Sequence, residues 1–263
     1  MMEGKGGAKS QAGALIMTPG TGTHDRVRNV FENAPRYLKS RHVDIRFRID
    51  TVMTYASQLE YQRGLDIGCG DGSISLQLVT ERSHFTLMDL SASMVARAKA
   101  NTPDGLSDYV ELRNENFTTA EFDSGHFDLV VSVGVMAHVD SPDDFLRKIK
   151  SLLPRGSNLI LEFTDAFHFV GRLGRFWSWM KELIAPATYA TNKLSYAAVA
   201  QLLDRHQFKV VSTFRYSRVP LPGFNILVNH AREYNLVKAF FGSCTKNRNA
   251  SLGNEYILLL RSE

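Results

Sequence analysis

Three glycines stand at alternate positions, Gly68, Gly70 and Gly72, in the segment GLDIGCGDGSISLQL that spans residues 64–78. Because glycine has no Cβ, such a loop turns tightly and lets a ligand lie against peptide N–H groups. Asp89 ends the next apolar run, FTLMD, 21 residues after Gly68. In a doubly wound sheet, a carboxylate at this place accepts hydrogen bonds from both ribose hydroxyls. The loop and the acid together predict a nucleoside site, with an ordinary glycine-rich turn as the alternative.

The spacing of the glycines disfavours some classes of nucleoside ligand. The pattern here is G-x-G-x-G preceded by Asp66, whereas dinucleotide-binding proteins carry G-x-G-x-x-G. The segment also lacks the phosphate-binding lysine of a P-loop. NAD and ATP are therefore disfavoured as ligands.

Four segments resemble class I S-adenosylmethionine-dependent methyltransferases in their order and spacing: LDIGCGDG, MDLSASMVARA, FDLVVSVGVMAHV and LLPRGSNLIL. The resemblance is to the broad group that includes quinone-biosynthesis and small-molecule methyltransferases, and it covers about residues 27–165. It implies a Rossmann-like fold with a mostly parallel, seven-stranded sheet. It also implies S-adenosyl-L-methionine as the cofactor.

The resemblance assigns cofactor contacts to residues from most of this core: Tyr37, Asp66, Gly68, Gly70, Gly72, Asp89, Leu90, Met94, Asn116, Phe117 and Val133. The three glycines are expected to pack under the methionine and ribose parts, and Asp66 to hold the loop and the ligand's amino group. Asp89 is expected to bind the ribose hydroxyls.

The remaining contacts concern the adenine and the two ends of the cofactor. Leu90 and Met94 resemble the family's apolar contacts around adenine, and Asn116 with Phe117 fall where the adenine edge is met. Val133 is expected to line the methionine side. Tyr37 resembles an aromatic residue that closes over the cofactor, where a ring face near a sulfonium gains about 1 kcal/mol. A plain helix-packing role for this tyrosine stays open.

His138 is the candidate for catalysis. The sulfonium is already a strong methyl donor, so the enzyme mainly has to hold the acceptor in line and exclude water. A hydroxyl acceptor must also lose a proton, and His138 follows the fourth strand near the carboxyl ends of the sheet, where such crevices lie. In relatives the matching histidine often supports the loop, so that alternative stays open. Some relatives bind a metal through carboxylates nearby, but Gly134 and Ala137 stand at those positions, so no metal is predicted.

The elements that must position these residues follow from the hydrophobic pattern. Strand-like and helix-like runs alternate from YQRGLDIG, through SISLQLVTER as a helix, to SNLILEFT, which predicts an α/β fold with a parallel sheet covered on both faces. Residues 1–23 are expected to be a flexible leader, and 24–263 a single methyltransferase domain. Within it we expect N-terminal helices at 24–60, the cofactor-binding core at 61–165, and a lid and acceptor region at 166–235 before the last strand.

The identity of the methyl acceptor must be inferred from the region after the fifth strand. The segment DAFHFVGRLGRFWSWMKELIAP puts aromatic and aliphatic residues on one helical face and basic residues on the other. We expect this segment to form a helix that caps the core or a mobile lid. A third alternative is that residues 167–184 contact a membrane surface or a lipid-linked acceptor. Glu162, His168, Tyr196 and Tyr216 border the expected acceptor side, with structural roles as the alternative.

Composition limits the partners. The 263 residues carry 31 basic and 27 acidic side chains, a formal net charge of +4, so charge alone does not indicate a nucleic-acid partner. Two cysteines cannot form a disulfide framework, and no apolar run approaches the roughly 18 residues of a membrane span, so a cytoplasmic protein is expected.

The sequence therefore predicts methyl transfer to a hydroxyl or amine of a small, partly apolar organic acceptor. A nucleic-acid methyltransferase is disfavoured because the fourth strand ends in SVGVM rather than in the Asn/Asp-Pro-Pro-Tyr/Phe sequence that holds a flipped base. No nucleic-acid partner is expected, although RNA methylation remains the alternative function. A binding protein that keeps only the fold is a third possibility.

Overall fold

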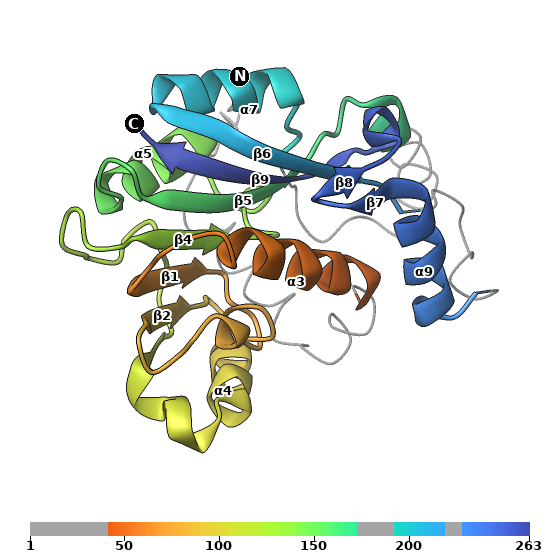
Figure 1. Cartoon of the computed structure of the whole chain (residues 1–263). Coiled ribbons are helices and arrows are strands. Elements are labelled where there is room, and N and C mark those ends of the chain that lie inside the picture. The colour runs from red at the N-terminus through yellow and green to blue at the C-terminus, as the bar shows by residue number, and fades with distance from the viewer. Residues whose placement is uncertain (1–41, 173–191, 219–227) are drawn as a thin grey trace, which may run out of the picture.

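The computed structural model describes residues 42–172, 192–218 and 228–263. Its centre is a seven-stranded sheet in the order β3-β2-β1-β4-β5-β9-β6 (Figure 1). The strands are β1 (Arg63–Ile67), β2 (His84–Met88), β3 (Val110–Arg113), β4 (Leu129–Ser132), β5 (Asn158–Thr164), β6 (Phe208–Tyr216) and β9 (Glu255–Ser262). A two-residue hairpin, β7 (Gly242–Ser243) and β8 (Lys246–Asn247), lies outside this sheet.

The directions in which the strands pair determine which strand ends lie side by side. Strands β1 to β5 pair in parallel, whereas β9 runs antiparallel between β5 and β6. The carboxyl ends of the parallel strands therefore share one edge of the sheet with the beginning of β9. The predicted mostly parallel, seven-stranded sheet is confirmed.

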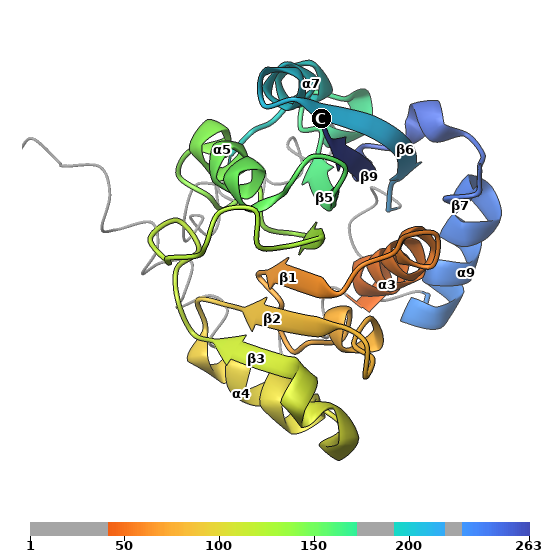
Figure 2. The same ribbon diagram turned by 60° about the vertical axis from the view of Figure 1, so that its left-hand side comes forward.

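Helices cover both faces of the sheet. They are α3 (His42–Ala56), α4 (Ala92–Asn101), α5 (Pro142–Leu152), α7 (Tyr196–Arg205) and α9 (His230–Phe241). Figure 2 shows α3 and α9 on one face and α5 and α7 on the other. Two buried apolar clusters follow this division, because one includes side chains of α5 and α7 and the other those of α3 and α9.

The helices begin where the sequence supplies a cap. In α5, the Ser141 hydroxyl accepts a hydrogen bond from the Asp144 amide (3.2 Å), Pro142 occupies the first turn, and Phe145 and Ile149 are buried. Ser91, Ser195 and Asn229 cap α4, α7 and α9 in the same way.

The helix predicted over SISLQLVTER is wrong. The segment forms a single 3₁₀ turn, Ser75–Gln77, followed by turns up to β2. The Ser75 hydroxyl donates to the buried Asp66 carboxylate instead of pointing to solvent, and Leu78 donates its amide to Ser75 rather than to the residue four positions earlier. The segment thus turns more tightly than an α-helix at Ser75–Gln77, next to the contact between Ser75 and the buried Asp66.

Several expectations fall on residues beyond the described ranges. The leader 1–23, Tyr37 and most of the expected lid helix lie outside them. The described part of the N-terminal region is α3, which confirms a helix before the core. Helix α9 and the β7–β8 hairpin, which precede the last strand, were not predicted.

Candidate functional site

The glycine loop follows β1 at the carboxyl edge of the sheet. Gly68, Gly70 and Gly72 have φ angles of +75°, +57° and +77°, which side chains other than glycine rarely adopt. The amides of Gly68 and Cys69 both donate to the Met88 carbonyl, at 2.8 and 3.0 Å, which fixes the loop over the end of β2. A Cβ on Gly68 would lie 2.4 Å from Val135, whereas one on Gly70 would meet no atom within 4 Å. Space for a ligand therefore lies beside Gly70.

Asp89 ties this loop to the next helix. Its Oδ2 accepts a hydrogen bond from the Gly70 amide (2.9 Å), and its Oδ1 accepts one from the Ser91 amide (2.8 Å). The carboxylate thus holds the glycine loop and the N-cap of α4 in one arrangement. This role was not predicted from the sequence, which indicated ribose binding alone.

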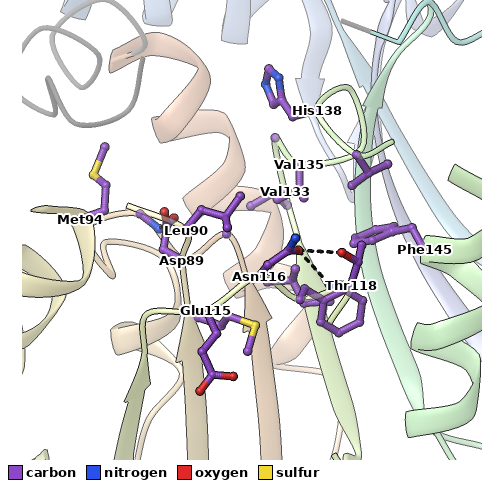
Figure 3. A pocket seen from close by; sticks show the side chains of 17 residues that line it. Asp89, Leu90, Met94, Glu115, Asn116, Thr118, Val133, Val135, His138 and Phe145 are labelled. Carbon is purple, nitrogen blue, oxygen red and sulfur yellow. Dashed lines mark hydrogen bonds between the residues drawn. The ribbon is translucent and has the colours of Figure 1, made fainter. Parts of the chain in front are cut away.

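One pocket joins the loop, Asp89 and the strand ends, and it encloses about 850 Å³ including its open mouth. Its lining includes nine of the predicted site residues: Gly68, Gly70, Asp89, Leu90, Met94, Asn116, Phe117, Val133 and His138. Figure 3 shows Asp89 and Leu90 on one side, Asn116 opposite, and His138 at the far end.

The expected adenine side of the pocket combines apolar surface with one oriented amide. Met94 is 1% exposed and Phe117 is buried edge-on against Phe145, with ring centres 5.3 Å apart. The Asn116 Oδ1 accepts hydrogen bonds from the Thr118 amide (2.9 Å) and hydroxyl (2.8 Å), drawn as dashed lines in Figure 3. These bonds fix the orientation of the Asn116 side chain at the pocket wall.

Asp66 and Gly72 do not line the pocket. Asp66 is 1% exposed and accepts a hydrogen bond from the Ser75 hydroxyl, so it anchors the chain beneath the loop. Burial, with the nearby charge of Asp89, raises the pKa of Asp66 to about 7. Its contact with a ligand's amino group stays a prediction.

His138 lies on the loop that follows β4. Its amide donates to the Val135 carbonyl (2.8 Å), and the Asn192 amide donates to the Ala137 carbonyl (2.8 Å). The Asn192 side chain also donates to the Val139 carbonyl. The loop is therefore held from a distant part of the chain, with His138 at the pocket. Proton transfer by His138 stays a prediction.

Four residues that border the expected acceptor side lie outside this pocket. His168 contacts the Ser251 carbonyl at 2.9 Å, and Tyr196 is 44% exposed and stacks on Tyr256. Glu162 and Tyr216 are buried on the α3 face. The Glu162 carboxylate lies 2.7 Å from Arg48 Nε.

The sequence reasoning missed several lining residues: Ile67, Met88, Glu115, Thr118, Gly134, Val135, Val139 and Phe145. Ile67 and Met88 end β1 and β2, so their place at the strand ends could have indicated them. Phe145 of α5 belongs to the buried core and to the pocket lining together.

No group of three or more histidine, cysteine, aspartate or glutamate side chains is arranged to hold a metal ion within the described ranges. No helix in that part of the chain has the length and apolar character needed to cross a bilayer.

Comparison with known proteins assigns residues 65–161 to a family described as a methyltransferase domain. The chain is similar to a tRNA U34 carboxymethyltransferase from Hahella chejuensis, with 31% identity over 140 residues that cover 50% of this chain and 42% of the relative. It is also similar to a ubiquinone biosynthesis O-methyltransferase from Aeromonas salmonicida, with 28% identity over 117 residues that cover 43% and 48%. The chain spans about half the length of the curated relatives it matches.

A solved structure gives the fold over almost the whole chain. The magnesium protoporphyrin IX methyltransferase from Synechocystis PCC 6803, with bound SAH, aligns with a TM-score of 0.61 and 16% identity. The alignment covers 92% of this chain and 100% of that one. At this identity the likeness is evidence for the Rossmann-like methyltransferase fold.

Proposed function

This chain carries a class I S-adenosylmethionine-dependent methyltransferase domain, and on that premise we propose that it transfers a methyl group to a hydroxyl or amine of a small, partly apolar organic acceptor. The observation that supports this most is the convergence of Gly68, Gly70 and Asp89 on one pocket with an apolar wall. The cofactor is S-adenosyl-L-methionine, which supplies an activated methyl group when bound.

The residues of the pocket fit the parts of that cofactor. The open space at Gly70 suits a ligand that lies against the loop, and Asp89 suits a ribose because carboxylate oxygens accept from both hydroxyls. Met94 and Phe117 offer apolar surface for the adenine ring, and Val133 lies toward the methionine side. Chain residues thus bind and orient the donor, and the fixed loop with His138 faces the acceptor.

His138 would take the proton of a hydroxyl acceptor. Its place at the pocket supports this role, because a general base must come within hydrogen-bond reach of the proton that it removes. Tyr37 is proposed to close over the cofactor. The cytoplasm is the proposed compartment.

RNA methylation is the second candidate. The tRNA enzyme from Hahella chejuensis, 31% identical over 140 residues, favours it, while the nearly balanced charge of this chain gives it little support. A lipid-linked acceptor is a third candidate, because Phe167 and Phe169 are 54% and 57% exposed at the start of the proposed lid. The contact with a membrane surface through residues 167–184 belongs to this candidate.

The test is incubation of the purified protein with methyl-labelled cofactor and a cell extract separated into small-molecule, lipid and RNA pools. The proposal expects label in the small-molecule pool. Label confined to RNA or to lipid would replace the proposed acceptor with the corresponding candidate. Label in no pool, from protein that binds the demethylated cofactor, would favour a binding protein that keeps only the fold.

A further inference from the structure

A group of buried polar side chains lies on the α3 face of the sheet, at the same edge as the pocket. We call Glu162, Glu255, Tyr216, Asp44 and Arg48 the acidic cluster. Glu162 lies two residues before the end of β5, Glu255 begins β9 and Tyr216 ends β6. Asp44 and Arg48 belong to α3, which packs over these strands.

Strand register brings the two glutamates and the tyrosine together. Glu162 pairs with Ile257 of β9, and Tyr216 pairs with Glu255 two residues earlier. Because residues two apart in a strand point to the same face, the three side chains lie on one face of three neighbouring strands. Glu255 is partly exposed, whereas Glu162 and Tyr216 are 2% and 0% exposed. The cluster therefore extends from the core to the edge of the sheet.

The cluster holds three carboxyl groups and one guanidinium. Arg48 Nε lies 2.7 Å from Glu162 Oε2, so this pair is balanced. Glu255 accepts a hydrogen bond from the Thr164 hydroxyl (2.7 Å), but no lysine or arginine among the described residues forms an ion pair with it. Burial and the charges of Glu162 and Asp44 raise the pKa of Glu255, while its hydrogen bond with Thr164 and the charge of Arg48 act in the opposite direction.

One cation near Asp44, Arg218, is shared with another acid. Arg218 donates to both oxygens of Glu233, at 3.0 and 3.2 Å, and its NH1 lies 3.7 Å from Asp44 Oδ2. Arg218 thus contacts two of the described carboxyl groups, those of Glu233 and Asp44. Buried carboxylates are stabilised by cations or by hydrogen bonds, so Glu255, which forms no ion pair with a described residue, suits a further positive group.

A second, independent observation points to a ligand. The Tyr216 hydroxyl is fully buried and has no hydrogen-bond partner among the described residues. The charges of Asp44, Glu162 and Glu255 raise the pKa of Tyr216 after burial, which places the phenol close to all three. Both carboxylate oxygens of Glu162 also lack a hydrogen bond in the described part of the chain, although Oε2 lies 2.7 Å from Arg48 Nε. A buried polar atom without a partner is costly, so these atoms are suited to bonds with a bound group.

The cluster adjoins the cofactor pocket. A Cβ on Gly134 would lie 3.1 to 3.2 Å from the guanidinium of Arg48, and Gly134 lines the pocket. Arg48 therefore connects the two, with its Nε toward Glu162 and its guanidinium tip against the pocket wall. An acceptor held by the cluster would lie beside the methionine side of the cofactor.

We propose that the acidic cluster binds the protonated amino group of the acceptor, so that the enzyme methylates an amine. This inference rests on the proposed function, because it names the acceptor of the same site. The amino group donates to Glu162 Oε1 and to Glu255, and the Tyr216 hydroxyl orients its nitrogen. The Glu255 carboxylate then takes one proton from R–NH₃⁺, which frees the lone pair of R–NH₂. That pair forms the new N–CH₃ bond as the S–CH₃ bond breaks and its electrons stay on sulfur, which yields R–NH₂⁺–CH₃, a neutral thioether and a protonated Glu255.

The first test uses three probes with one apolar body and different head groups: butylamine, butanol and butyrate. Thermal unfolding at pH 7 is followed for the wild type, Glu162→Gln, Glu255→Gln and the control Glu81→Gln, whose side chain is exposed. Butylamine is expected to raise Tm in the wild type and in the control, and to lose this effect in the two cluster variants. Equal effects of the three probes, no effect of butylamine on the wild type, or an unchanged effect in Glu255→Gln would overturn the inference.

The second test uses methyl-labelled cofactor and small molecules sorted beforehand on a cation exchanger at pH 7. Label is expected in the retained, cationic fraction, with kcat/KM lowered roughly 10- to 100-fold in Glu255→Gln while the affinity for the demethylated cofactor is unchanged. Label only in unretained compounds would overturn the amine acceptor and leave methyl transfer intact. Failure of the protein to bind cofactor would refute the proposed function instead, and the butylamine test would still decide the cluster.

Tyr216→Phe separates binding from a structural role. Because the hydroxyl has no partner among the described residues, its removal should not lower Tm. It should raise KM for the cationic fraction roughly 3- to 10-fold, the loss of one ordinary hydrogen bond. An unchanged KM would contradict the contact of Tyr216 with the acceptor.

Discussion

Replacement of Asp89 by alanine removes two functions of one carboxylate. The oxygens hold the Gly70 and Ser91 amides at 2.9 and 2.8 Å, and we expect them also to bind the ribose of the cofactor. An isosteric asparagine is not neutral here, because its NH₂ group must face one of the two backbone donors. The glycine loop and the start of α4 are therefore loosened by either substitution.

The magnitudes follow from the number of bonds lost. Loss of the charge-assisted bonds to the ribose should weaken cofactor binding by about 1.5 to 3 kcal/mol, or roughly 10- to 150-fold in Kd. Loss of the two backbone bonds at this half-buried site should lower the free energy of unfolding by about 1 to 3 kcal/mol. For a chain of this size, that corresponds to a decrease in Tm of roughly 3 to 10 °C.

The assay is isothermal titration calorimetry with the demethylated cofactor, accompanied by thermal unfolding of each variant. Asp71→Asn is the matched control, because this carboxylate lies in the same loop, accepts a bond from the Ser73 amide and does not line the pocket. Its affinity should stay close to that of the wild type. A folded Asp89→Ala protein that binds the cofactor as tightly as the wild type would refute the ribose role of Asp89.

Three further substitutions test other parts of the site. Gly72→Ala should lower the free energy of unfolding, measured by denaturant titration, by at least about 1 to 2 kcal/mol. The reason is that φ at Gly72 is +77° and an added Cβ would lie 2.7 Å from Leu76. Unchanged stability would contradict this loop geometry. If the acceptor is a hydroxyl, His138→Ala should reduce turnover by about 100-fold or more and leave the cofactor affinity unchanged. Near-normal turnover would mean that His138 only supports the structure of its loop. The pKa of Asp66 is raised to about 7 in the folded protein from an ordinary value of 3.8, so the folded state binds the Asp66 proton more tightly than the unfolded state does. This difference stabilises the folded protein fully below about pH 4, and the stabilisation is lost as the pH rises through 7. Asp66→Asn should flatten the Tm of ligand-free protein between pH 5 and 8, and an unchanged pH profile would count against the burial of an ionisable group here.

The strands were predictable because each is a short apolar run bounded by polar or turn residues. The segments LDIG, FTLMD and LVVS, for example, are buried on both sides in the structure, which gives continuous apolar runs rather than alternation. The segment after Gly72 was not predictable by the same means. Its apolar residues fit a helix, but the bond between Ser75 and the buried Asp66 is a tertiary contact that periodicity does not record.

The pocket and the acidic cluster differ in how much the sequence shows of them. Gly70 and Asp89 belong to a local motif, so their convergence could be predicted from spacing. Glu162, Glu255 and Tyr216 are separated by up to 93 positions and meet because β9 runs antiparallel between β5 and β6. Nothing in the spacing of these residues indicates that arrangement, although Glu162 was noted at the end of its strand.

The central claim is that the glycine loop and Asp89 hold a sulfonium nucleoside. The most direct measurement is a titration of ¹⁵N-labelled protein with S-adenosyl-L-methionine, followed by amide NMR spectra. The account predicts that the largest shifts fall on the amides of Gly68, Gly70 and Asp89, with smaller shifts around Asn116. Shifts confined to other regions, or an unchanged spectrum at saturating cofactor, would contradict it.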